Sequence, residues 1–334
     1  MFTIDSYGLA VVFCLITMLG WGSWANTLKM TPARWEFPLY YWDYCIGLVL
    51  TSLVLGLTMG STGAEGRSFL TDLGQAETSA LGSAFLGGIV FNLSNLLIVA
   101  ATAIAGLAVA FPIAVGLALV IGVVVNYLAT PVGDATLLFL GLLLVVVAII
   151  IDGLAYKKMQ QSDTSNLRKG IIISVLSGVL MGFFYRFVAA SMTLTFADPT
   201  PGLLTPYSAM FVFTLGVFAS SFVFNTWFMF RPVSGEAVAF GDYFSRGTPK
   251  LHLIGVLGGL IWCVAMEFNL IAAEQAGFAI SYGLGQGATM VSAAWGVFVW
   301  KEFAGAPKGT NKLLTAMFAS FILGLVLIVV ARLT

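Results

Sequence analysis

Among the charged side chains inside strongly apolar stretches of this sequence, three stand out: Asp43, Arg186 and Glu267. A charge surrounded by hydrocarbon is energetically unfavourable, so such residues usually serve a function. A carboxylate withdrawn from water takes up a proton more readily, whereas a guanidinium keeps its proton and can only donate hydrogen bonds. We therefore predict that Asp43 and Glu267 take part in proton coupling and that Arg186 binds a solute or acts in gating.

Each of these charges also has a structural explanation. Asp43 could be held permanently by a neighbour near the membrane rim, namely Asn26, Trp24 or Lys29. Arg186 could form a fixed ion pair with Glu267, because both lie about 24 Å from the same face at a rise of about 1.5 Å per residue. For Glu267 we favour the ion pair, although it would take up a proton if Arg186 moved away during transport.

Uncharged polar and aromatic side chains accompany the charges. Asn92 and Asn95 are three residues apart, and Tyr282 and Gln286 are four apart, so each pair shares a helix face. Amides both donate and accept hydrogen bonds, and a Trp ring can stack on a flat ring or a sugar face, although any single Asn could instead join two helices. The predicted solute-binding residues are Trp21, Trp24, Asn26, Asn92, Asn95, Tyr185, Arg186, Tyr282 and Gln286.

Helix-breaking residues give a second indication of a site. Pro112 falls inside one apolar run, and Gly283 and Gly285 fall inside the corresponding run of the second half. Matching interruptions in two halves are typical of solute sites in transporters, because unwound backbone offers free N–H and C=O groups. Glycines can also serve only to let helices pack closely, which is our interpretation of Gly87 and Gly88.

Other chemistry is not indicated. Cys14, Cys45 and Cys263 all lie in apolar runs, where we expect them to pack, and they suggest no disulfide or metal framework. We expect no catalytic or metal role for His252, the single histidine, and no cofactor. Without a Ser/His or Cys/His pair we do not expect an enzyme, and the net charge of zero does not indicate nucleic-acid binding.

The elements that carry these residues are membrane-spanning helices. The composition is 59% hydrophobic and only 9% charged, whereas soluble domains carry about 25% charged residues. The apolar runs are about twenty residues long, which suits a helix that crosses the bilayer. We predict an all-α integral membrane protein with ten such helices, at about 6–28, 37–59, 79–102, 105–128, 135–155, 169–191, 205–230, 251–274, 278–299 and 312–333.

The distribution of Lys and Arg predicts the orientation. Twelve of these residues fall at one end of the helices and two, Arg67 and Arg332, at the other. Cytoplasmic loops carry the excess of positive charge, so we expect the basic end in the cytoplasm and both termini outside.

The two halves of the sequence resemble each other. With a shift of 171 residues, Leu-Gly-Gly-Ile at 86–89 aligns with Leu-Gly-Gly-Leu at 257–260, and Ala-Gly-Leu-Ala at 105–108 with Ala-Gly-Phe-Ala at 276–279. Five helices is an odd number, so a second copy runs upside down relative to the first. We predict one five-helix repeat at 1–156, a cytoplasmic linker at 157–169 and an inverted repeat at 170–334.

Several motifs resemble those of the ureide permease family and its bacterial relatives. These are Gly-Trp-Gly-Ser-Trp-Ala-Asn at 20–26, Tyr-Trp-Asp-Tyr at 41–44, Gly-Gly-Ile-Val-Phe-Asn-Leu-Ser-Asn-Leu at 87–96, Ile-Ser-Tyr-Gly-Leu-Gly-Gln-Gly-Ala-Thr at 280–289 and Trp-Gly-Val-Phe-Val-Trp-Lys-Glu-Phe at 295–303. That family belongs to the drug/metabolite transporter superfamily, alongside glucose/ribose porters and the rhamnose–proton symporter. The family pattern includes Asp43 but no acid at Glu267.

The resemblance implies ten helices in two inverted halves, a central cavity lined by helices 1–4 and 6–9, and proton-coupled uptake. The family carries allantoin, uracil and related compounds, and its sister groups carry sugars. We therefore expect a secondary transporter in the plasma membrane that takes up a small neutral polar solute with a proton. An exporter, a facilitative carrier and a channel are the alternatives. If two copies form a homodimer, we expect contact through the uniformly apolar helices at 135–155 and 312–333.

Overall fold

The computed structural model describes residues 1–159, 166–233 and 235–334. Its elements are all helical apart from one isolated β-bridge. They are α1 (Tyr7–Ser23), α2 (Asn26–Lys29), α3 (Phe37–Leu57), α4 (Phe69–Gln75), α5 (Thr78–Ala105), α6 (Leu107–Ala129), α7 (Ala135–Lys157), α8 (Leu167–Ser191), α9 (Pro206–Phe230), α10 (Phe240–Ser245), α11 (Pro249–Ala276), α12 (Phe278–Gly285), α13 (Ala288–Ala294), the π-helix η1 (Trp295–Val299) and α14 (Thr310–Val330).

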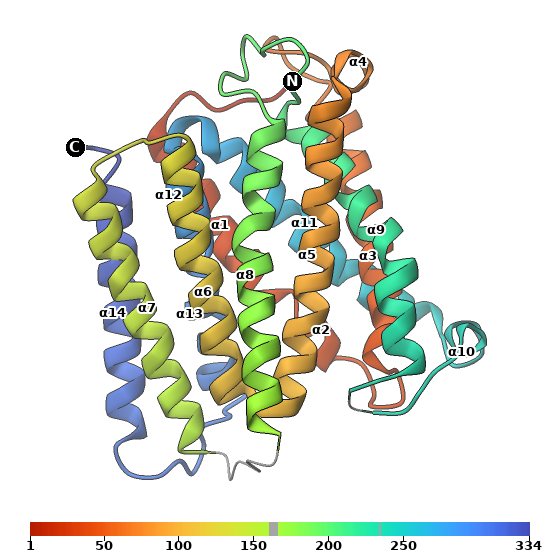
Figure 1. Ribbon diagram of the computed structural model, residues 1–334, viewed down its shortest axis with the longest axis vertical. Helices are drawn as coiled ribbons and strands as arrows, with labels where there is room; N and C mark the ends of the chain where they lie inside the picture. Colours follow the sequence, from red (N-terminus) through yellow and green to blue (C-terminus); the bar gives the residue numbers. More distant parts are fainter. Residues whose placement is uncertain (160–165, 234) are drawn as a thin grey trace.

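Long apolar helices dominate the chain (Figure 1). Within the residues that the structure describes, nine helices are long and apolar enough to cross a membrane, with α1 and α2 together forming the first of them. Their ends lie within a few residues of nine of the ten predicted runs. The prediction of an all-α integral membrane protein is confirmed.

The remaining predicted span, at 278–299, is not one continuous helix. It consists of α12, α13 and η1, with a break at Gln286 and Gly287 between the first two. Glycines at 283, 285 and 287 lower the helix propensity of this segment. A side chain at Gly287 would also lie 2.7 Å from the Met18 side chain. None of the three pieces is long enough to count as a spanning helix by itself.

Specific residues begin and end the long helices. The side chain of Asp134 accepts a hydrogen bond of 2.8 Å from the backbone N–H of Leu137 and so caps α7. Gly106 (φ 77°) ends α5 and begins α6, and Gly277 (φ 83°) does the same between α11 and α12. Positive φ combined with extended ψ is open essentially to glycine alone, so these two residues allow each pair of helices to follow with no intervening loop.

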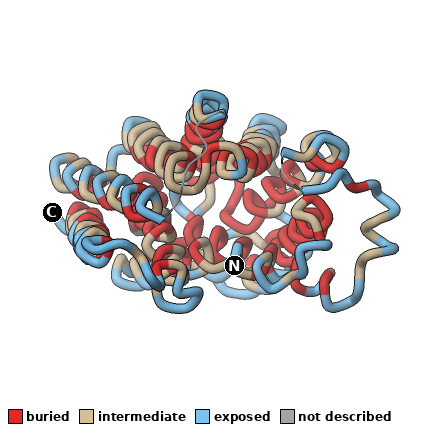
Figure 2. Tube along the Cα trace, turned by 90° about the horizontal axis from the view of Figure 1, so that it is seen from below, coloured by how far each residue is buried: buried red, intermediate tan, exposed pale blue. Residues whose placement is uncertain are grey.

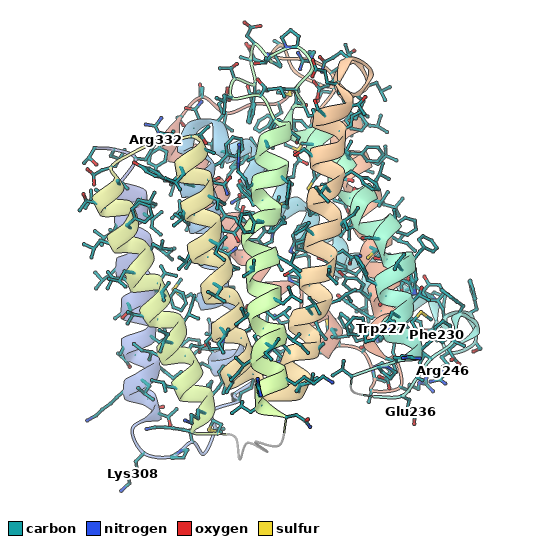
Figure 3. The ribbon with its side chains drawn as sticks, viewed as in Figure 1. Trp227, Phe230, Glu236, Arg246, Lys308 and Arg332 are labelled. Atoms are coloured by element: carbon teal, nitrogen blue, oxygen red, sulfur yellow. The ribbon has the colours of Figure 1, made fainter. Side chains whose placement is uncertain are left out.

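The helices pack as neighbours that are distant in the sequence. α5 contacts α8 and α9, α11 contacts α1 and α3, and α7 lies along α14. Viewed along the helices, buried residues gather where helices face one another and exposed residues follow the outer rim (Figure 2). The lower end of the molecule carries Lys308 and Arg246, and the upper end carries Arg332 and both termini (Figures 1 and 3).

Candidate functional site

A cavity of about 300 Å³ lies among helices of both halves of the chain. Its lining comes from α1, α2, α3, α5, α6, α8, α11 and the segment around α13, and it includes Trp21, Trp24, Phe37, Phe91, Asn95, Thr102, Leu107, Phe111, Ala118, Ser177, Phe184, Trp262, Gln286, Thr289 and Ser292. The lining residues of α6 all fall in its first half, Leu107 to Ala118, which is the lower half of that helix in Figure 1. The cavity therefore extends from mid-height toward the lower, basic end.

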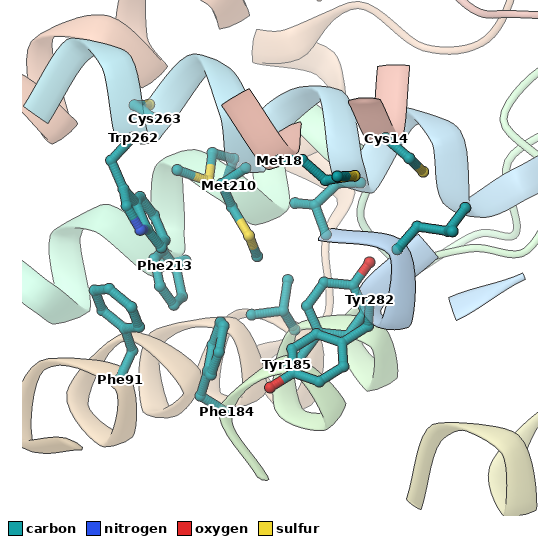
Figure 4. Packing of buried hydrophobic residues seen from close by; sticks show 14 of the residues in the cluster. Cys14, Met18, Phe91, Phe184, Tyr185, Met210, Phe213, Trp262, Cys263 and Tyr282 are labelled. Atoms are coloured by element: carbon teal, nitrogen blue, oxygen red, sulfur yellow. The ribbon is translucent and has the colours of Figure 1, made fainter. Parts of the chain in front are cut away.

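Aromatic rings form the wall of the cavity at mid-height. The ring of Trp262 stacks on that of Trp21 with 5.9 Å between centroids and lies 4.5 Å from that of Phe91. Phe184 and Phe213 complete the cluster, which lies between α5, α8, α9 and α11 (Figure 4). Trp21, Phe91, Phe184 and Trp262 of this cluster belong to the cavity lining, so the wall is apolar and aromatic, and aromatic rings can stack on a planar or sugar-like solute.

The polar groups of the cavity are uncharged. Asn95 is held by a hydrogen bond of 3.1 Å from its amide nitrogen to the Tyr41 hydroxyl, while Gln286 lies at the break between α12 and α13. Hydroxyls of Thr102, Thr289 and Ser292 also line it. Among the described residues that line this cavity there is no Asp, Glu, Lys or Arg. The site therefore offers amide and hydroxyl hydrogen bonds to a solute, but it has no charged side chain that could balance the charge of an ionic solute.

Four of the predicted solute-binding residues line the cavity, and others bond helix to helix instead. Trp21, Trp24, Asn95 and Gln286 belong to the lining. Asn92 is fully buried and bonds to Tyr41, Ser220 and Ser221, which joins α5 to α3 and α9. The Tyr185 hydroxyl donates to Asn269 at 2.7 Å, that of Tyr282 reaches the Ala118 carbonyl at 3.3 Å, and Asn26 accepts from the Trp300 indole at 2.6 Å.

Arg186 and Glu267 do not pair in this structure. Glu267 is fully buried, and neither of its carboxylate oxygens has a hydrogen-bond partner among the described residues. Arg186 is half-buried, next to Tyr185 on α8, and within the described chain it forms no ion pair. Neither residue belongs to the cavity lining. The fixed ion pair, which was the favoured interpretation of Glu267, is therefore not observed.

Asp43 has partners other than those expected. Its carboxylate accepts a hydrogen bond from the Tyr243 hydroxyl of α10, and both of its oxygens lie 3.0 Å from Nδ1 of His252. Asn26, Trp24 and Lys29 make no contact of this kind with it. Asp43, Tyr243 and His252 lie outside the cavity lining. His252, for which no catalytic or metal role was expected, holds a buried carboxylate here.

The predicted helix breaks lie at different points of the two halves. α6 runs through Pro112 without interruption, because the first half changes direction earlier, at Gly106. Gly283 lies within α12, and Gly285 is its last residue, directly before the break at Gln286. A Cβ at Gly285 would lie 2.8 Å from the Trp21 ring, so close packing rather than backbone freedom requires glycine there.

A second hollow adjoins the cavity at the lower end. This vestibule, of about 210 Å³, shares Ala25, Leu107, Phe111, Thr289 and Ser292 with the cavity. Unlike the cavity, it is lined by charged residues, namely Lys29, Asp152 and Glu302. Asp152 is not among the residues predicted from the sequence, although it is an acid inside the apolar run at 135–155, as Asp43 is inside the run at 37–59.

Glu302 is neutralised within the vestibule. One carboxylate oxygen accepts a hydrogen bond of 2.6 Å from Lys29, and the other accepts one of 2.8 Å from the Tyr156 hydroxyl. Partial burial acts to raise the pKa of the Glu302 carboxyl, but these hydrogen bonds and the Lys29 charge outweigh it and hold the pKa below its usual range. Lys29 also lies 5.1 Å from the centre of the Trp300 ring. These contacts tie α2, α7 and the segment after η1 together.

Comparison with known proteins agrees with the motif resemblance. A family model described as ureide permease matches residues 40–170 and 154–331. Ureide permease 1 of Arabidopsis thaliana is 24% identical, covering 96% of both chains, and the glucose uptake protein GlcU of Bacillus subtilis (strain 168) is 26% identical, covering 68% of both. One protein crystal structure has a TM-score of 0.61 at 18% identity over 98% of this chain and 99% of that chain, which concerns the fold alone.

The expected family is thereby confirmed. The relatives are named as permeases and an uptake protein, so the chain is a membrane transporter of small solutes and not an enzyme. The family model spans most of the sequence, and with the multiple apolar helices it indicates a multi-pass protein of the plasma membrane. The chain belongs to the ureide permease family.

Proposed function

We propose that this protein is a secondary transporter that takes up a small neutral polar solute together with a proton by alternating access. The observation that carries the proposal is the cavity itself: amides and hydroxyls set among aromatic rings, with no charged residue in its described lining. Such a lining favours a solute with several hydrogen-bonding groups and no net charge. The cavity is walled by aromatic rings at mid-height and adjoins the vestibule at the lower end, as in a carrier with one side open.

The solute class follows from the lining and the relatives. A ureide or nucleobase presents both donors and acceptors around a flat ring, which suits Asn95, Gln286 and the Trp faces. A sugar offers the same combination of hydroxyls and a stacking face, and a glucose uptake protein is among the relatives. We therefore propose ureide-like, nucleobase-like or sugar substrates. Arg186, which follows Tyr185 on α8, is proposed to act in gating or solute binding.

Alternating access requires two halves that can exchange conformations, and we propose that residues 1–156 and 170–334 are inverted repeats. Part of the linker at 157–169 lies outside the described residues. Gly106 and Gly277, which are 171 residues apart, share nearly the same backbone angles, and each directly connects a long helix to the helix that follows it. With α12, α13 and η1 taken together as one crossing, each half has five, which supports ten in total.

Close helix contacts also recur in matching pairs. A side chain at Gly88 of α5 would collide with the backbone of α9, and one at Gly259 of α11, 171 residues later, would collide with the backbone of α3 in the same manner. The reverse contacts match as well. The four pairs are Gly88 with Phe213, Gly259 with Tyr44, Gly216 with Phe85, and Gly47 with Val256. An exchange of the two halves maps this contact pattern onto itself, as expected for inverted repeats.

The proton coupling and the orientation are part of the same proposal. Asp43 and Glu267 are buried carboxylates within membrane helices, so both are proposed as proton carriers. Asp43 would exchange its proton through His252, which is partly exposed at the lower end. The excess of Lys and Arg places that lower end in the cytoplasm and both termini outside.

Uptake by purified protein in vesicles tests the proposal. We expect labelled allantoin, uracil or glucose to accumulate when the outside is acidic and to exchange in counterflow without a gradient. Asp43→Asn and Glu267→Gln should each reduce accumulation more than counterflow. Counterflow without gradient-driven accumulation would indicate a facilitative carrier. Flux that does not saturate and shows no counterflow would indicate a channel. Transport that requires the solute inside and acid outside would indicate an exporter.

A further inference from the structure

Asp152 is a buried acid that faces the solute path and has no partner. It lies on α7, lines the vestibule and is 8% exposed. Its Oδ1 has no hydrogen-bond partner, and within the described chain Asp152 forms no ion pair. The undescribed residues, 160–165 and 234, include no Lys, Arg or His. A buried carboxylate in this position is unstable as an anion unless a positive charge joins it.

The groups that face Asp152 do not supply that charge. Glu302 and Tyr156 are its titratable neighbours in the vestibule, and both are already engaged with each other. Lys29 is bound to Glu302 at 2.6 Å. Of the helices packed against α7, α6 carries no charged residue, and the only one of α14 is Lys312, which is exposed at its first turn. The vestibule thus holds one neutralised carboxylate and one that is not.

The geometry favours a proton over a metal cation. A hard cation takes six or more oxygen ligands, but Asp152 and Glu302 are the only carboxylates in the described lining of the vestibule, and Glu302 is already bound to Lys29 and Tyr156. A proton needs only the free carboxylate. Gly153, which follows Asp152, packs directly on Pro112 and the Ala108 carbonyl of α6. The segment of α7 that carries Asp152 is therefore in contact with a helix that lines the cavity.

We infer that Asp152 is a proton-binding site at the mouth of the solute cavity, and that it loads and releases the proton that moves with the solute. The inference rests on the proposed transport function and adds to it a third acid, the one that lines the solute path. A proton from outside water forms an O–H bond with the carboxylate. When the vestibule opens to the cytoplasm, that bond breaks, the proton returns to water and the carboxylate is restored.

Asp152→Asn tests the assignment, with Asp198→Asn as the matched control because Asp198 is exposed in the upper loop. In proteoliposomes with labelled uracil, allantoin and glucose, we expect Asp152→Asn to equilibrate solute without accumulating it under a pH gradient, while counterflow continues. Asp198→Asn should accumulate as the unmodified protein does. Asp152→Glu should restore accumulation with a shifted pH dependence, which also serves if the Asn variant does not fold.

Several outcomes would overturn the assignment. Accumulation by Asp152→Asn equal to that of the unmodified protein would remove Asp152 from coupling, as would accumulation driven by a sodium gradient instead of a pH gradient. An equal loss of counterflow and accumulation in both folded Asp152 variants would assign it a structural role. Absence of counterflow in the unmodified protein would refute the transport function itself, whereas counterflow without pH-driven accumulation would refute only the proton site.

Discussion

The carboxylates of this membrane domain differ in whether the surrounding side chains supply hydrogen-bond donors. Asp43 accepts bonds from His252 and Tyr243, and Glu302 is held by Lys29 and Tyr156. Glu267 and Asp152 have no such donors in the described chain. An unpaired buried polar group costs about 1–3 kcal/mol, so each of these two carboxylates lowers the stability of the fold.

Replacement of Glu267 by Met should stabilise the protein. Met has a similar volume and no polar atom that needs a partner, so we expect the free energy of unfolding to rise by about 1–3 kcal/mol. Thermal unfolding in detergent measures the change, and proton-driven uptake measured on the same sample would be expected to fall. A lower unfolding temperature for Glu267→Met would show that the carboxylate has partners that this structure does not contain.

Loss of a cavity amide should weaken solute binding without destabilising the fold. Gln286→Leu and Asn95→Leu each remove hydrogen bonds of about 1–1.5 kcal/mol, so the half-saturation concentration in counterflow should rise about tenfold. Asn311→Leu makes the same chemical change at an exposed position of α14 and should have no effect. Unchanged half-saturation in both cavity variants would move the solute site elsewhere.

At the scale of elements, the helices are arranged by a few positions where backbones meet or turn. Gly106 connects α5 directly to α6, and Gly277 connects α11 directly to the short α12. The glycines of α5 and α11 let these helices lie against α9 and α3. On the lower side, α2 is joined to the segment after η1 by the Lys29–Glu302 ion pair and by the bond from Trp300 to Asn26. The helix ends next to the cavity are thus held by contacts between segments that are far apart in the chain.

Alanine at either connecting glycine should destabilise the fold. At Gly106 and at Gly277 the backbone angles disfavour any side chain, so each Ala variant should lose about 1–3 kcal/mol of unfolding free energy. Gly82→Ala is the control: Gly82 is helical with open space around its Cα, and Ala there should be neutral or stabilising by about 0.5–1 kcal/mol. Equal unfolding temperatures for all three variants would contradict the backbone argument.

The Lys29–Glu302 contact should be lost in acid. Because the pKa of Glu302 is lower in the folded protein than the ordinary value of about 4.3, the contact stabilises the fold above that value and ceases to do so as the pH falls through the folded pKa. The unmodified protein should therefore unfold at a higher temperature than Glu302→Gln at neutral pH, and the difference should vanish in acid. A difference that persists in acid would have a cause other than ionisation.

At the scale of the whole molecule, the proposed mechanism depends on which end faces the cytoplasm and on an even number of crossings. Both termini lie at the upper end, and Lys308 and Arg246 lie at the lower end. The cavity leads downward through the vestibule, so the structure corresponds to a cytoplasm-open carrier if the basic end is inside. α7 and α14 pack on each other and expose mainly apolar side chains, and they are the surface proposed for a homodimer.

Cysteine labelling tests this arrangement. Cys14, Cys45 and Cys263 are buried, so they should react little with a membrane-impermeant maleimide. We expect Lys308→Cys to react only in inside-out vesicles and Arg332→Cys only in right-side-out vesicles, with Ser292→Cys reactive from the cytoplasmic side through the vestibule. Reaction of Lys308→Cys and Arg332→Cys from the same side would rule out the proposed topology.

The sequence by itself determined the class of protein, the ends of nine long helices and the family. These depend on apolar run length and on local motifs, which are properties of consecutive residues. It also identified Trp21, Trp24, Asn95 and Gln286 as candidates before the cavity was known. Asn92 and Tyr185 looked equivalent to them, because a sequence shows that a polar residue is inside the membrane but not which neighbour it faces.

Only the tertiary structure determined which side chains the charged residues bind. His252 is 209 residues from Asp43 and Lys29 is 273 from Glu302, so no local pattern connects them. The break at Gln286, the vestibule and the exposure of Asp152 to it likewise arise from the packing of α6, α7 and the segment around α13. Hydrogen-bond partners and cavities are set by distances between segments far apart in the chain, and these exist only once the helices have packed.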